Sequence, residues 1–73
     1  MTVYHYLLAL DEAGYLKPLI RRGVISSHLV QWMDIYAYHL GHSSLSHVQI
    51  ALQKDTGKST VQRALAFMNQ PMD

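Results

Sequence analysis

The sequence contains no cysteine, only two prolines and few charged residues. Without cysteine, the 73-residue chain has no disulfide framework, no cysteine-based metal site and no cysteine nucleophile. It also lacks an uninterrupted apolar run of about 18 residues, the length that a membrane-spanning helix needs. The first apolar stretch ends at Asp11 and Glu12, which predicts no targeting segment. We therefore expect no membrane partner and a cytoplasmic location.

Charge of one sign is equally scarce. The formal net charge is +1, so binding to nucleic acid through a polybasic surface alone is excluded, and any such contact must use a few placed basic side chains. Only five carboxylates are present, and neither they nor the serines are spaced for acid–base or nucleophilic catalysis. We expect no enzymatic activity, no small-molecule substrate and no cofactor.

The apolar residues, which make up 49% of the chain, indicate one folded domain with one core. They recur at helical spacing, and sustained alternation typical of strands is missing. The sequence therefore predicts a single all-α domain, residues 1–73, of about five short helices. The expected ranges are 2–13, 15–22, 26–40, 44–55 or 46–55, and 59–69. Each of the four glycines, Gly14, Gly23, Gly41 and Gly57, is expected to end a helix in the left-handed conformation.

The third expected helix is the most apolar and is predicted to form the centre of the core, with Trp32 as its central residue. Its expected buried arc contains Leu29, Val30, Trp32, Met33, Tyr36, Ala37 and Leu40. Ile35 and Tyr38 lie off this arc, which makes them candidates for contact with a second copy of the chain. The expected inner faces of the last two helices are Leu45, Val48, Ala51 and Leu52, and then Val61, Ala64, Leu65 and Met68.

The last two expected helices carry the most specific pattern, VQIALQKDTGKSTVQRAL at residues 48–65. This stretch resembles the helix-turn-helix of bacterial DNA-binding regulators, in which a second helix crosses the first over a tight turn. Ala51 fits the small residue at the crossing, and Val61 fits the early β-branched anchor of the second helix. The turn residue with positive φ is then either Gly57 or Asp55. An ordinary corner between two helices is the alternative interpretation.

The resemblance covers about residues 46–68, within a unit expected at 44–69. It implies sequence-specific binding to double-stranded DNA, by a small transcriptional regulator or a phage or mobile-element accessory factor. With Val61 inward, the opposite face of the last helix presents residues suited to base edges, namely Ser59, Gln62, Arg63 and Ala66. The residues expected to contact phosphates around the turn are Lys54, Lys58 and Thr60. Lys17, Arg21 and Arg22 form a second basic group, which is either a further phosphate contact or a solvated helix end.

The three histidines His39, His42 and His47 lie close together in sequence. We expect no metal site there, because no cysteine or carboxylate accompanies them, and we interpret them as residues at helix ends. The alternative function is a protein–protein adaptor or oligomerising helical module. A positive stripe of Lys54, Lys58 and Arg63 would favour DNA, whereas an exposed patch of Ile35, Tyr38 and Phe67 would favour the adaptor. A further hypothesis is a homodimer formed through the third or first helix.

Overall fold

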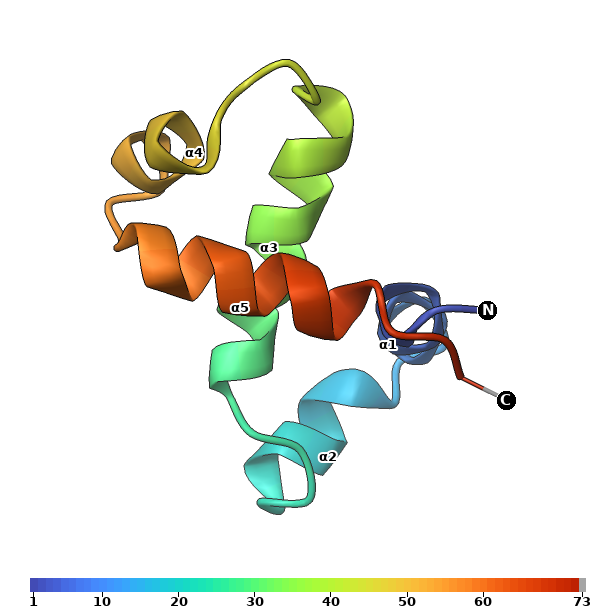
Figure 1. The fold of residues 1–73 in the computed structure, drawn as a ribbon. Coiled ribbons are helices and arrows are strands. Elements are labelled where there is room, and N and C mark those ends of the chain that lie inside the picture. The colour runs from blue at the N-terminus through green and yellow to red at the C-terminus, as the bar shows by residue number, and fades with distance from the viewer. Residues whose placement is uncertain (73) are drawn as a thin grey trace.

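Residues 1–72 are described by a computed structural model, and they form five helices and no extended sheet (Figure 1). The helices are α1 (Val3–Glu12), α2 (Leu16–Arg21), α3 (His28–Gly41), α4 (His47–Gln53) and α5 (Lys58–Met68). The predicted all-α class with five short helices is confirmed. Each helix begins and ends within a few residues of its expected bounds, and capping residues in the sequence mark several of the ends.

The helix starts show how these signals act. Thr2 precedes α1, and its hydroxyl accepts a hydrogen bond from the His5 amide. Ser46 and Gln49 form a capping box at the start of α4, in which each side chain accepts the other residue's backbone N–H. Ser27 precedes α3 as expected, but its side chain makes no capping hydrogen bond.

The glycine prediction is correct at two of the four positions. Gly14 and Gly23 have φ values of +83° and +76° and end α1 and α2 in the left-handed conformation. Gly41 is instead the last residue of α3, and Gly57 has a φ of −88° and stands immediately before α5. The left-handed residue between α4 and α5 is Asp55, with a φ of +51°. Aspartate tolerates this conformation better than most residues other than glycine.

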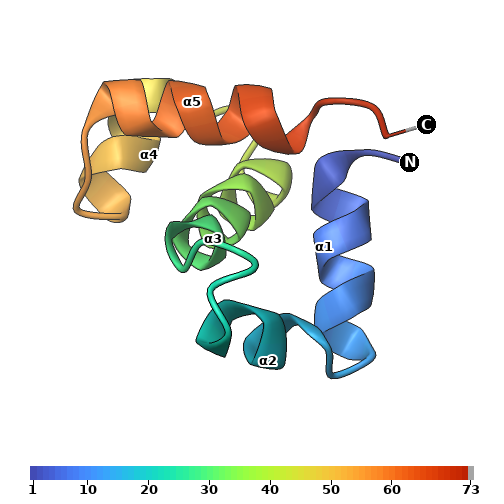
Figure 2. The same ribbon diagram turned by 90° about the horizontal axis from the view of Figure 1, so that it is seen from below.

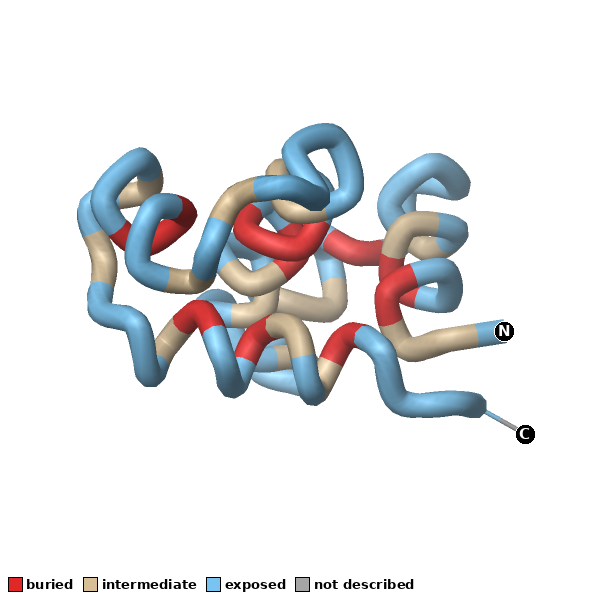
Figure 3. Tube along the Cα trace, turned by 45° about the horizontal axis from the view of Figure 1, so that its top comes forward, coloured by how far each residue is buried: buried red, intermediate tan, exposed pale blue. Residues whose placement is uncertain are grey.

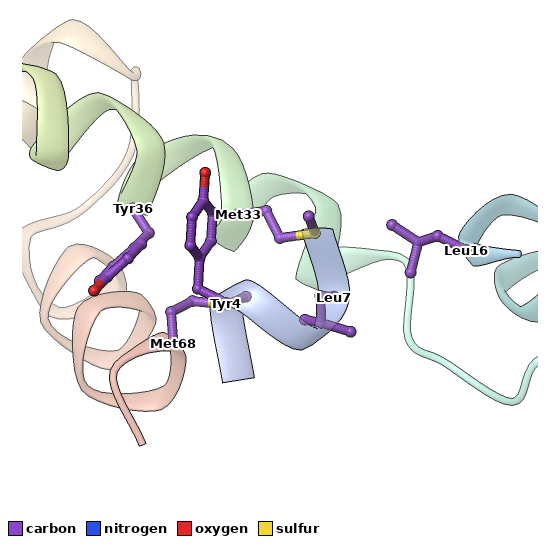
Figure 4. Packing of buried hydrophobic residues seen from close by; sticks show 6 residues of the cluster. All are labelled: Tyr4, Leu7, Leu16, Met33, Tyr36 and Met68. Atoms are coloured by element: carbon purple, nitrogen blue, oxygen red, sulfur yellow. The ribbon is translucent and has the colours of Figure 1, made fainter. Parts of the chain in front are cut away.

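The hydrophobic core consists of two clusters that meet along α3 and α5. The first joins α1, α2, α3 and α5 and contains Tyr4, Leu7, Leu16, Met33, Tyr36 and Met68 (Figure 4). The second joins α3, α4 and α5 and contains Ile35, Ile50, Ala51, Val61 and Ala64. Because α3 and α5 contribute to both clusters, they form the structural centre of the domain.

The prediction that Trp32 is the central buried residue of α3 is wrong. Trp32 is only half-buried and packs beside both clusters, with its ring 5.6 Å from that of Phe67. Ile35, which the expected arc leaves outside, is fully buried. Val30 and Leu40, which the arc includes, are 49% and 54% exposed. The reason is that α3 packs against α1, α4 and α5 on different sides, so no single arc describes its contacts.

The exposed patch of Ile35, Tyr38 and Phe67, which would favour an adaptor, is not formed. The Tyr38 ring stacks on the His42 ring at 4.2 Å, and the Lys54 ammonium lies 4.8 Å from its centre. Ile35 is buried and Phe67 is half-buried, so these residues form no exposed patch with Tyr38. For the same reason, Ile35 is not available for contact with a second copy of the chain.

The inner face of α5 is as predicted, whereas that of α4 is rotated. Val61, Ala64 and Met68 are all fully buried, and Leu65 is half-buried and packs against both clusters. In α4 the buried residues are Ile50 and Ala51, while Val48 and Leu52 are 48% and 76% exposed. Because α4 has only seven residues, its apolar pattern is too short to fix the direction of its buried face.

Two further features determine which surfaces are free. The Val3 and Met72 amides donate hydrogen bonds to the Gln70 and Met1 carbonyls, at 2.9 and 2.8 Å, so the two ends lie side by side. Helix α5 forms one edge of the molecule, and α1, α3 and α4 all lie on the same side of it (Figure 2). Its outward face is therefore not covered by any other helix of residues 1–72.

Candidate nucleic-acid interface

Helices α4 and α5 pack directly on each other around a tight turn. Figure 1 shows α4 nearly end-on and α5 from the side, so that the two helices cross at a large angle. Ala51 and Val61 belong to the same buried cluster at this crossing. The small side chain of Ala51 allows the close approach, and the buried Val61 fixes the start of α5 against α4.

The turn between the two helices is held by backbone hydrogen bonds at the end of α4. The Thr56 amide donates to the Ala51 carbonyl at 2.9 Å, and the Asp55 amide donates to the Leu52 carbonyl at 3.4 Å. This is the Schellman pattern, which requires a left-handed residue at the position that Asp55 occupies. Of the two alternatives that the sequence left open for the left-handed turn residue, Asp55 is therefore correct and Gly57 is not.

The four residues expected to read bases all lie exposed on α5. The buried positions alternate with exposed ones along this helix (Figure 3). The exposed set includes Ser59, Gln62, Arg63 and Ala66. Within residues 1–72, neither Gln62 nor Arg63 forms a side-chain hydrogen bond or an ion pair. Their polar groups are thus available to a partner.

The residues expected to contact phosphates differ from one another. Lys58 is exposed and is the first residue of α5, whereas Thr60 is half-buried. Lys54 is engaged within the chain, because its ammonium lies 2.8 Å from the Asp34 carboxylate and also faces Tyr38. Of the three residues of the expected positive stripe, Lys58 and Arg63 remain exposed. They are five residues apart on α5, about 140° around the helix, so they form no continuous stripe.

The second basic group lies apart from this surface. Lys17, Arg21 and Arg22 are exposed on or directly after α2. Helix α2 packs mainly against α1 and lies at the end of the molecule opposite α4 (Figures 1 and 2). A ligand held at the start of α5 alone would therefore not meet this group.

A shallow hollow of about 480 Å³ lies beside Lys58, between the end of α3, the start of α4 and the start of α5. Its lining residues are His39, Ser43, Leu45, Ser46, His47, Val48, Lys58 and Gln62. His39 and His47 are close to His42 in the sequence, whereas Lys58 follows His47 only after a full helix and a turn. Only the packing of α4 on α5 brings these residues together.

His42 is not part of the hollow. Its ring stacks on Tyr38, and its Nδ1–H donates to the Tyr38 carbonyl at 3.1 Å. Across residues 1–72, no three histidine or carboxylate side chains are arranged to hold a metal ion. The polar character of the hollow therefore comes from one ammonium, two imidazoles, hydroxyls and an amide, and no carboxylate lines it.

Comparison of the chain with models of protein families, with curated proteins and with solved structures finds no match. None of the helices in residues 1–72 has the length and apolar character needed to cross a membrane. The functional interpretation therefore rests on the surface chemistry of α4, the turn and α5.

Proposed function

We propose that this protein binds double-stranded DNA, with α4, the turn and α5 acting as a helix-turn-helix and α5 entering the major groove. The observation that carries the proposal is the uncovered outer face of α5, at the edge of the molecule (Figure 2). An α-helix with its side chains is about 10–12 Å in diameter, and the major groove is about 12 Å wide and admits one α-helix. The helix therefore fits the groove without rearrangement of the core.

The side chains on this face have the chemistry of base readers. Arginine donates two hydrogen bonds to guanine, glutamine pairs with adenine, and a small apolar side chain contacts a thymine methyl group. Arg63, Gln62 and Ala66 supply these three groups. Lys58 at the start of α5 is placed at the rim of the groove, where phosphates lie.

The buried residues at the crossing also support a helix-turn-helix. Ala51 and Val61 are 5% and 0% exposed, as expected for the small residue and the anchor of this motif. Asp55, four residues after Ala51, stands at the position that the motif usually gives to the turn glycine. Its left-handed conformation supplies the backbone geometry required there.

A role in transcription or in a mobile element, and a cytoplasmic location, follow as further parts of the proposal. So does the pairing of two copies, because DNA sites are often read as two half-sites about 34–36 Å apart. The adaptor alternative is favoured by one observation, the exposure of Val48 and Leu52 on the outer side of α4. A monomeric mass by light scattering at high concentration would contradict the pairing.

The test is a titration of a fluorescent random-sequence duplex at several salt concentrations, followed by anisotropy. We expect binding that weakens with salt with a modest log–log slope, because each neutralised phosphate contributes about 0.9 to that slope and few basic residues are available. Lys58→Ala is expected to weaken binding, while Lys17→Ala on α2 serves as the matched control. A folded protein that binds no duplex at low salt would contradict the proposal and favour the adaptor.

A further inference from the structure

The hollow beside Lys58 gathers hydrogen-bond donors from three elements. Lys58 comes from the first turn of α5, His47 from the first residue of α4, and Ser43 from the loop after α3. Ser46 Oγ accepts the Gln49 amide at 3.2 Å, which leaves its own O–H free to donate. An acceptor with several oxygens and negative charge matches this set better than a cation or an apolar group does.

His39 lines the hollow from the end of α3. Its Nδ1 atom is buried and has no hydrogen-bond partner within residues 1–72, but because it is closed to solvent it is not a contact for a ligand in the open hollow. The donors that a ligand can reach are therefore those of Lys58, His47, Ser43 and Ser46.

From this arrangement we propose that the hollow binds a backbone phosphate of DNA between Lys58 and His47, so that DNA affinity rises as the pH falls. The proposal rests on the function proposed above and extends it to the regulation of the same surface. Histidine changes charge between about pH 5 and 8. A phosphate placed against the imidazole favours its charged form, so binding takes up a proton and is strengthened at lower pH.

The charged and titratable groups around His47 allow this coupling. Lys58 faces it from α5 and His39 from α3, and no carboxylate lines the hollow to compete with a phosphate. Asp34 and Asp55 are not among the residues that line the hollow, and Asp34 is paired with Lys54. Phosphate is therefore the partner that gains most from protonation of the hollow.

The test measures the affinity for a random duplex of about 20 base pairs, two helical turns, between about pH 8 and pH 6 at constant ionic strength. The proteins compared are the parent chain, His47→Gln and His28→Gln. His28 is an exposed histidine at the start of α3, about 16 Å along this helix from His39, which lines the hollow. Its variant controls for the general gain of positive charge at low pH. Circular dichroism at both pH values verifies that each variant is folded.

We expect the affinity of the parent and of His28→Gln to rise about threefold to tenfold on acidification, and that of His47→Gln to change much less. Equal pH profiles for the parent and His47→Gln would overturn this inference while leaving DNA binding intact. Absence of duplex binding at every pH would overturn both. Sodium phosphate at matched ionic strength is the final arm. Weak competition by free phosphate supports binding of a backbone phosphate. If millimolar phosphate abolishes the dependence of DNA affinity on pH, the hollow binds free phosphate and the proposal is contradicted.

Discussion

The Lys54 ammonium lies 2.8 Å from the Asp34 carboxylate and links the end of α4 to the middle of α3. The lysine side chain is 24% exposed and the aspartate side chain is 63% exposed, so the pair is partly solvated, mainly at the carboxylate. Exposed ion pairs contribute about 0–1 kcal/mol to stability. The larger consequence concerns function, because the pair reduces the positive charge that Lys54 presents to an anionic partner.

Lys58 and Lys54 should therefore differ in their effect on DNA binding. Lys58→Ala is expected to weaken binding to every sequence and to lower the slope of log K against log salt by about 1, because one phosphate contact is lost. Lys54→Ala is expected to change the slope much less. Salt titrations of the two variants with a random duplex provide the measurement. An equal fall of the slope in both variants would show that the Lys54–Asp34 ion pair breaks when DNA binds.

Arg63 is predicted to act on sequence preference. Arg63→Ala should cost about 1–3 kcal/mol on a preferred site and relax the preference at one base pair, if this arginine meets a guanine. The site is first selected from a random duplex library, and the variant is then titrated on that site and on a random duplex. Equal weakening on both would show that Arg63 contacts only phosphate.

The left-handed conformation of Asp55 predicts that Asp55→Gly stabilises the protein. Glycine adopts this conformation without steric cost, and part of the gain is offset by the greater freedom of the unfolded chain, which leaves about 0.5 kcal/mol. Urea unfolding followed by circular dichroism measures the difference.

Gly57→Ser is the companion variant at the neighbouring glycine. Because Gly57 has a negative φ and stands before α5, a serine hydroxyl can cap the helix, and we expect a gain of a few tenths of a kcal/mol. A loss of about 1 kcal/mol or more in this variant would instead show that Gly57 is the left-handed residue.

Ile35 is predicted to be a more sensitive core position than the sequence indicated. Ile35→Val should cost about 0.5–1.5 kcal/mol, because a buried methylene is removed between α3, α4 and α5. Val30→Ala, at an exposed position of the same helix, should cost less than about 0.5 kcal/mol. Urea midpoints of the two variants check this order, and the reverse order would place Val30 in the core.

The buried face of a helix is predictable from the sequence where polar and apolar positions are clearly separated along it. In α5 the residues Val61, Ala64 and Met68 recur at helical spacing, and polar residues flank Val61, so their burial was predicted correctly. In α3 nearly every position from Trp32 to Leu40 is apolar or aromatic, and packing on three sides decided which of them were buried. No periodicity within α3 contains that information.

The candidate interface was predictable to a similar extent. The exposure of Gln62 and Arg63 follows from the α5 pattern, since both fall outside the stripe of Val61, Ala64, Leu65 and Met68. The pairing of Lys54 with Asp34 was not predictable, because the two residues are 20 positions apart and meet only through the packing of α4 on α3. That His47 and Lys58 line one hollow has the same origin, since it depends on the crossing of α4 and α5.

The adjacent ends of the chain have a consequence for engineering. The Met72 amide bonds to the Met1 carbonyl, so a short flexible linker can join these residues without disturbing α1 or α5. New ends opened in the exposed segment between α2 and α3 would then give a circularly permuted protein whose helix order in the chain is α3, α4, α5, α1, α2. In such a chain the helices that form the second core cluster are synthesised first, and α1 and α2 then close over the remaining side of α3.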